Sequence, residues 1–169
     1  KLILLLDERQ RKELAQYSPY IAMLKVSSQN RRYIPMDYLE REIIPGDKLF
    51  TMPSATSYEF GKLMSNVHMA WTRAVCGRLK SDYSYSNTIV YNNFPWPSPT
   101  KAILNARALY PDSNLADLYD PLTMPTELLK AHNANNRAVM DAYGFSIKMS
   151  EADCVAELMR MYQKLTKEK

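Results

Sequence analysis

Lys80 and Asp82 have the side-chain types and the spacing that best suit a chemical task. They stand two residues apart in RLKSDYSYS, residues 78–86, where two sets of side chains alternate. A period of two is typical of a β-strand, so the lysine and the aspartate are expected on one face of a strand. Lysine can donate to guanine O6 and N7, and aspartate can accept from the amino group of cytosine. The pair would therefore suit recognition of a G·C base pair.

The same two residues have a plainer interpretation. Lys80 and Asp82 can form a solvated strand face with a surface ion pair, worth at most about 1 kcal/mol. The spacing by itself favours this interpretation, and it leaves both alternatives open.

A predicted helix precedes this strand and would position it. Apolar side chains recur at intervals of three and four residues, which is the spacing of one buried helical stripe. Thr56 and Glu59 have the spacing of a capping box, and Gly77 stands where a left-handed residue commonly ends a helix. The pattern predicts one helix from Thr56 to about Val75. Its stripe consists of Phe60, Leu63, Met64, Val67, Ala70, Trp71, Ala74 and Val75.

Short strand-like runs separated by turns occupy the first third of the chain. Residues 20–26 and 49–52 are predicted strands, and a further extended piece starts at residue 33. The turn before residue 33 holds Arg31 and Arg32, whose guanidinium groups match phosphate oxygens. Ordinary solvated loop charge is the alternative for these arginines. Residues 1–6 could begin a helix or form a strand, because periodicity does not distinguish the two.

The composition changes at residues 97–99, Pro-Ser-Pro, which mark a predicted domain boundary. Helices are predicted over residues 101–109 and 124–143, the second with Pro125 early and Gly144 at its stop. A last helix is expected to begin at Ser150. The predicted fold class is α+β, with a mixed domain over residues 1–97 and a mainly helical segment over residues 98–169.

Composition excludes several kinds of site from the chain. Its 169 residues carry a net charge of +4 and a pI near 9.0, which is compatible with nucleic acid. Four glycines leave no room for a glycine-rich cofactor loop, and no cysteine–histidine cluster has zinc spacing. No apolar run is long enough to cross a membrane, so no membrane partner is expected. Cys76 and Cys154 fall on separate predicted helices, as in an intracellular reduced protein, and His132 is expected to be structural.

Four phrases of the sequence resemble one protein family. The chain is similar to the C-terminal part of the MmeI-like, type IIL restriction–modification enzymes and related adenine-specific DNA methyltransferases. The resemblance implies a DNA target recognition domain over residues 1–97, truncated at its start, and a C-terminal helical segment behind it. It also implies that the charged residues just after GRL, Lys80 and Asp82, read a base. The phrases are RRYIPM, SNVHMAWTRAVCGRLKSDYSYS, IVYNNFPWP and YDPLTMPTELLKAHNANNRAVMDAYG.

NNFPWP, residues 92–97, superficially resembles the Asn-Pro-Pro-aromatic motif that holds a flipped adenine in amino-methyltransferases. Phe94 stands at the first proline position of that motif, and no glycine-rich cofactor loop precedes it on a strand. We therefore interpret Phe94 and Trp96 as packing residues in a proline-stiffened exit from the domain, and we expect no catalytic residue in the chain.

The resemblance implies a recognition function in a bacterial, cytoplasmic enzyme. Its partners would be double-stranded DNA and the methyltransferase domain of the same parent chain. No cofactor is expected in these residues; the parent would use S-adenosylmethionine to methylate a flipped adenine, and Mg²⁺ if it also cleaves DNA. The alternative function is a protein-interaction or structural docking module that reads no bases. The residues expected to contact or support the DNA backbone are Arg78, Arg31, Arg32, Ser81, Tyr83 and Tyr85.

Overall fold

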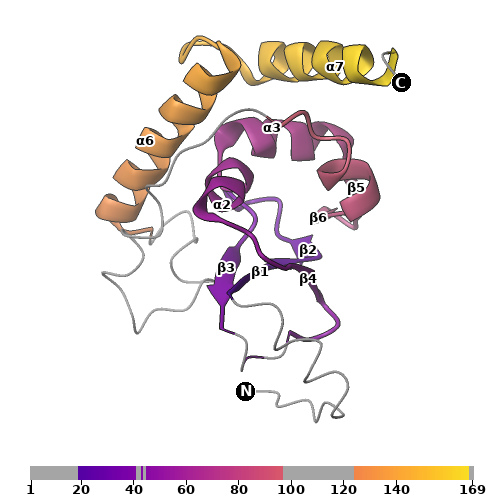
Figure 1. The fold of residues 1–169 in the computed structure, drawn as a ribbon, viewed down its shortest axis with the longest axis vertical. Helices are drawn as coiled ribbons and strands as arrows, with labels where there is room; N and C mark the ends of the chain where they lie inside the picture. The colour runs from indigo at the N-terminus through magenta and orange to yellow at the C-terminus, as the bar shows by residue number, and fades with distance from the viewer. Residues whose placement is uncertain (1–18, 41–42, 44, 97–123, 168–169) are drawn as a thin grey trace.

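The computed structural model describes residues 19–40, 43, 45–96 and 124–167 (Figure 1). These residues form two small antiparallel sheets and a set of helices, which confirms the predicted α+β class. The elements, in chain order, are β1 (Tyr20–Leu24), β2 (Val26–Ser27), β3 (Met36–Leu39), β4 (Leu49–Met52), α2 (Ser57–Leu63), α3 (Asn66–Val75), β5 (Gly77–Leu79), β6 (Asp82–Ser84), the π-helix η1 (Asn87–Tyr91), α6 (Thr126–Tyr143) and α7 (Glu151–Lys167).

The first sheet has the strand order β3-β1-β4, and its central strand β1 is almost wholly buried. The strands predicted at residues 20–26 and 49–52 are confirmed, although the first is interrupted at Lys25. The extended piece that begins at residue 33 becomes a strand at Met36. The buried side chains of β1 and of residues 33–36 form one hydrophobic core with the buried side chains of α2 and α3.

Lys25 is the single residue between β1 and β2, and it joins the two sheets. Its N–H donates to the Lys48 carbonyl (3.1 Å), on the first sheet's side. Its carbonyl accepts from the Tyr85 N–H (2.8 Å), just after β6. The second sheet has the order β2-β6-β5, so the β1–β2 segment holds the hairpin β5–β6 against the rest of the fold.

The predicted single helix from Thr56 to Val75 is two helices, so that prediction is wrong. Ser65 breaks it: its backbone is extended (φ −103°, ψ 159°) and its Oγ accepts from the His68 N–H (3.2 Å). A serine that satisfies the free amides of a new helix start competes with continuing the old helix. The capping box at the start of α2 is confirmed, since the Glu59 carboxylate accepts from the Thr56 N–H (2.7 Å) and the Thr56 hydroxyl accepts from a first-turn amide.

The end of α3 also differs from the prediction. The helix ends at Val75, and Cys76 is already extended (φ −72°, ψ 153°). Gly77 does not have a positive φ and is the first residue of β5. Gly77 therefore does not end the helix as a left-handed residue, and α3 runs almost directly into the hairpin.

The chain after η1 is fixed by aromatic packing. The Trp71 indole N–H donates to the Val90 carbonyl (2.9 Å), and Phe94 is buried between His68, Trp71 and Trp96. The interpretation of Phe94 and Trp96 as packing residues is confirmed.

The helices α6 and α7 are confirmed, although α6 begins at Thr126 and Pro125 precedes its first turn instead of lying within it. Gly144 is left-handed (φ 71°) after α6, and the Ser150 hydroxyl accepts from the Asp153 N–H (3.1 Å) at the start of α7. Figure 1 shows α7 lying over α3, and α6 descending along the side of α2. Residues 1–6, the helix expected over residues 101–109 and the boundary at residues 97–99 lie outside the described residues.

Two buried asparagines attach α6 to the first part of the chain. The Asn136 amide donates to the Tyr33 hydroxyl (2.8 Å), and its oxygen accepts from the backbone N–H of Asn66 (2.8 Å). Asn135 donates to the Gly61 carbonyl (2.8 Å). Because Asn66 is the first residue of α3, its N–H has no partner within the helix, and Asn136 supplies one. We call this set the amide clamp.

Candidate nucleic-acid interface

Residues 77–84 form a two-stranded hairpin, which we call the recognition hairpin. Leu79 pairs with Asp82, so Lys80 and Ser81 make a two-residue turn. The prediction of one strand with Lys80 and Asp82 on one face is therefore wrong. Lys80 stands at the tip of the hairpin, and Asp82 is the first residue of the returning strand.

The turn holds Lys80 in an unusual backbone conformation. Of the two turn residues only Lys80 has a positive φ (56°), the pattern of a type II′ turn, which usually has glycine at that position. A residue other than glycine costs roughly 1–2 kcal/mol in the left-handed region, because of its Cβ atom. The lysine is exposed there, so its side chain is presented to solvent at the cost of local strain.

The recognition hairpin has two different faces, because paired residues of antiparallel strands point to the same side. The pairs Leu79–Asp82 and Gly77–Ser84 share one face with Val26 of β2. We call this the outer face, since none of these residues is buried. The opposite face carries the pair Arg78–Tyr83 and Ser27, and there Tyr83 and Ser27 are buried.

Arg78 folds back on its own hairpin. Its guanidinium lies 4.2 Å from the centre of the Tyr83 ring and donates to the Ser81 carbonyl in the turn (3.3 Å). These two contacts connect β5 to the turn and to β6, and so stabilise the hairpin. The guanidinium has five N–H donors, and the group is exposed, so donors remain for a phosphate.

Arg31 and Arg32 lie in the loop between β2 and β3, and the Tyr83 hydroxyl joins this loop to the hairpin by donating to the Gln29 carbonyl (3.4 Å). Arg32 is exposed; its guanidinium lies over the Tyr33 ring (5.6 Å) and donates to Asn133 Oδ1 of α6 (3.1 Å). The structure thus attaches the loop to the hairpin through Gln29, whereas the Arg32 side chain is oriented by α6.

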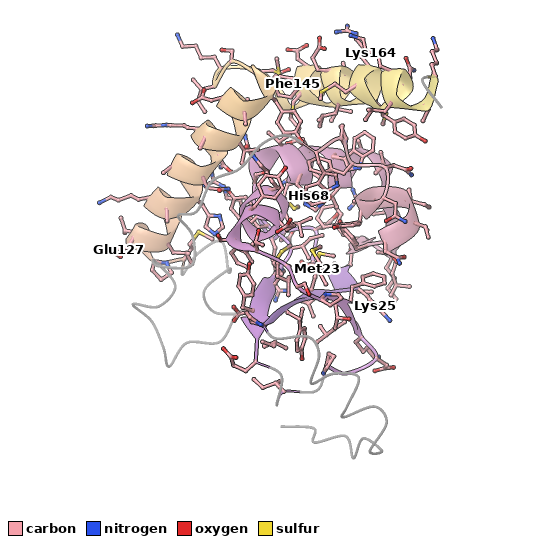
Figure 2. The ribbon with its side chains drawn as sticks, viewed as in Figure 1. Met23, Lys25, His68, Glu127, Phe145 and Lys164 are labelled. Carbon is pink, nitrogen blue, oxygen red and sulfur yellow. The ribbon has the colours of Figure 1, made fainter. Side chains whose placement is uncertain are left out.

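Tyr85 and His68 anchor the base of the hairpin, and Figure 2 shows His68 in the interior of the fold. His68 Nδ1 is 2.9 Å from the Leu63 carbonyl, and Nε2 is 3.0 Å from the Tyr85 hydroxyl. Because a carbonyl can only accept, Nδ1 carries the proton, and Nε2 accepts from the tyrosine. Burial lowers the pKa of His68 to about 4 and raises that of Tyr85 far above its ordinary value. The imidazole is therefore neutral near pH 7 and holds Tyr85 against the core.

Sequence reasoning missed His68 and Lys25. In the sequence His68 is a polar residue between Val67 and Met69 in a helix with a buried apolar stripe, and this was the available signal. Lys25 interrupts a strand-like run; its ammonium lies over the Phe50 ring (5.1 Å) and donates to the Asp47 carbonyl (2.6 Å).

A cavity of about 270 Å³ opens between β1, β4 and η1. Its walls include Met23, Phe50, Met52 and Tyr91, and no acidic or basic side chain lines it. Among the described residues no group of three or more His, Cys, Asp or Glu side chains could hold a metal ion. In the same part of the chain, no helix has the length and apolar character needed to cross a membrane.

Comparison with known proteins gives consistent matches over residues 6–168. Residues 6–98 match the family described as the MmeI target recognition domain, and residues 98–168 match the MmeI C-terminal domain. The chain is 38% identical over 164 residues to DNA methyltransferase A of Bacillus subtilis (strain 168), covering 91% of this chain and 18% of that protein. It is also similar to a solved structure of the type IIL restriction–modification enzyme MmeI in complex with DNA. That match has 42% identity and a TM-score of 0.83, and covers 90% of this chain and 22% of that one. The chain thus spans about a fifth of the length of either protein.

Proposed function

The chain belongs to the MmeI family through its target recognition and C-terminal domains, and on this premise we propose that it is the DNA sequence recognition module of a bacterial type II restriction–modification DNA methyltransferase. The observation that supports this most directly is the recognition hairpin, which presents a strained, exposed Lys80 at its tip and Asp82 beside it. A two-stranded β-ribbon has the dimensions to enter the major groove.

In this proposal Lys80 and Asp82 read one G·C pair. The lysine donates to guanine O6 or N7 from the tip, and the aspartate accepts from the cytosine amino group. They reach the pair from successive positions around the turn, since they do not share one strand face. Each good base contact is expected to contribute about 1–3 kcal/mol of discrimination.

Arg78, Arg31 and Arg32 contact phosphates in the same proposal. Phosphate contacts fix the register of a protein on the duplex without reading sequence. Arg32 is held by its bond to Asn133, so α6 would help to set that register. Ser81, Tyr83 and Tyr85 support the hairpin through its turn, its inner face and its base.

Catalysis would take place elsewhere in the parent chain. The proposed reaction is methyl transfer from S-adenosylmethionine to an adenine flipped out of the stack, with Mg²⁺ required if the parent also cleaves DNA. The described residues provide neither a glycine-rich cofactor loop nor a metal-ligand cluster that would fit these groups. The role of this chain is to place the duplex for the methyltransferase domain.

The experiment is DNA binding by the full-length protein. Methylated adenines in the host genome first define the target. Fluorescence anisotropy then compares a target duplex with a scrambled one over a range of salt concentrations. We expect tighter binding to the target, and a salt dependence that weakens when Arg31 and Arg78 are changed to alanine, because fewer counterions are then released.

Equal affinity for the two duplexes would contradict the proposal. Specific binding whose salt dependence is unchanged in the arginine variants would remove these arginines from the backbone contacts. Binding that is absent altogether would favour the docking module.

A further inference from the structure

Leu79 exposes 58% of its surface, the largest exposed fraction among the large apolar side chains that the structure describes. It is the last residue of β5 and immediately precedes the turn. A leucine at this position gains little from burial in the folded chain.

The side chain of Leu79 belongs to the outer face. Its cross-strand partner is Asp82, and directly paired residues have Cβ atoms about 4.5–5.5 Å apart. Lys80 follows it at the tip. Arg78 and Tyr83 point to the other side, where the guanidinium lies on the ring, so neither of them covers the leucine. Leu79 thus forms an apolar spot opposite Asp82 and next to Lys80, the two charged residues proposed to read a base pair.

Single exposed leucines are ordinary on protein surfaces, and exposure alone does not indicate a contact. Leu165 on α7 is 53% exposed and has no such setting. Two observations distinguish Leu79: its direct pairing with Asp82, and the strained Lys80 backbone that fixes the tip beside it. Any surface that Asp82 reaches on the outer face is also within reach of Leu79.

The major groove offers one apolar group on natural base edges, the C5 methyl group of thymine. We infer that Leu79 contacts a thymine methyl group in the major groove, beside the base pair contacted by Lys80 and Asp82, an inference that rests on the proposed function. A methylated adenine always has a thymine opposite it, so the target of an adenine methyltransferase contains at least one such methyl group. Leu79 would then add a preference for thymine that the two charged residues cannot supply.

The test removes the methyl group from the DNA and the side chain from the protein. Each thymine of the mapped target is replaced in turn by deoxyuridine, and the affinity of the full-length protein is measured for each duplex. The same set is measured with Leu79→Ala and with the matched control Leu165→Ala. At one thymine position we expect wild type to lose affinity about fourfold, the effect of one buried methyl group. Leu79→Ala is expected to bind the thymine and deoxyuridine duplexes equally at that position, and Leu165→Ala to behave as wild type.

The inference is overturned if the ratio of thymine to deoxyuridine affinities at every position is the same in wild type and Leu79→Ala. In that case a wild type that still prefers its target over a scrambled duplex leaves the proposed function intact. A wild type without any preference for the target would overturn both.

Discussion

The recognition hairpin and the amide clamp use polar side chains in opposite ways. In the clamp Asn135 and Asn136 are buried, and their amide groups donate to Gly61 and Tyr33. In the hairpin Lys80 and Asp82 point outward from a strained turn. In Figure 1 the helix α6, which carries the two asparagines, and the hairpin strands β5 and β6 lie on opposite sides of α2. Buried polar groups with fixed partners position elements, whereas exposed ones remain available to a ligand. Substitutions in the hairpin should therefore change the stability of the protein little and impair DNA recognition. Substitutions in the clamp should lower the stability.

The largest loss of stability is expected from Asn136→Ala. The change leaves the Asn66 N–H and the Tyr33 hydroxyl without their partner, and each such buried group costs about 1–3 kcal/mol. We expect the free energy of opening of the α3 and α6 amides to fall by about 3 kcal/mol, measured by hydrogen–deuterium exchange in the full-length protein. Asn133→Ala on the same helix, which removes only the exposed bond to Arg32, should change protection by less than about 0.5 kcal/mol. Equal effects of the two variants would contradict the difference between clamp and surface.

A smaller loss of stability, which depends on pH, is expected when His68 is replaced by glutamine. Its pKa falls from 6.5 in the unfolded chain to about 4 in the folded one. The unfolded state therefore binds more protons between these values, and this contribution to stability is complete above pH 6.5 and is lost as the pH falls to 4. Chemical denaturation of wild type and His68→Gln should show a stability difference that narrows by about 2 kcal/mol between pH 7.5 and pH 5. A difference that stays constant would mean that His68 is not buried as a neutral group.

The smallest effect on stability, and of opposite sign, is expected at the tip. Lys80→Gly relieves the positive φ and should stabilise the hairpin by up to about 1 kcal/mol. It also removes the proposed guanine contact, so target affinity should fall at least about tenfold while affinity for scrambled DNA changes less. Ser54→Gly is the matched control, because Ser54 has the same φ of 56° outside the hairpin. That variant should gain stability and keep its specificity; a Lys80→Gly protein with full specificity would argue against base reading.

Local signals in the sequence predicted much of the fold. The strand at residues 49–52, the capping box at Thr56 and the stop at Gly144 are each set by residues within a few positions of one another. The family resemblance is confirmed by the matches over residues 6–98 and 98–168. The division at residue 97 stays a prediction.

The predictions are wrong where contacts between residues far apart in the sequence determine the structure. The Lys80–Ser81 turn contains neither glycine nor asparagine, so nothing local marks it, and the alternation of side chains continues through it. The pairing of β6 with β2, more than fifty residues earlier, fixes the hairpin instead. Ser65 interrupts a periodic apolar pattern that runs on without a phase change, so the break between α2 and α3 was not visible. The roles of Lys80, Asp82 and the arginines stay predictions.

The central claim, that the recognition hairpin reads one base pair, is tested most directly by mapping methylated adenines for wild type and for the double variant Lys80→Glu, Asp82→Arg of the full-length protein. The variant exchanges donor and acceptor at the tip, and a glutamate at position 80 keeps the same backbone strain as the lysine. The matched control is Lys164→Glu, Asp141→Arg, which reverses two exposed charges on α7 and α6. We predict that the double variant methylates a motif in which one G·C pair has become C·G and every other position is kept, while the control keeps the wild-type motif. An active double variant with an unchanged motif would contradict the account.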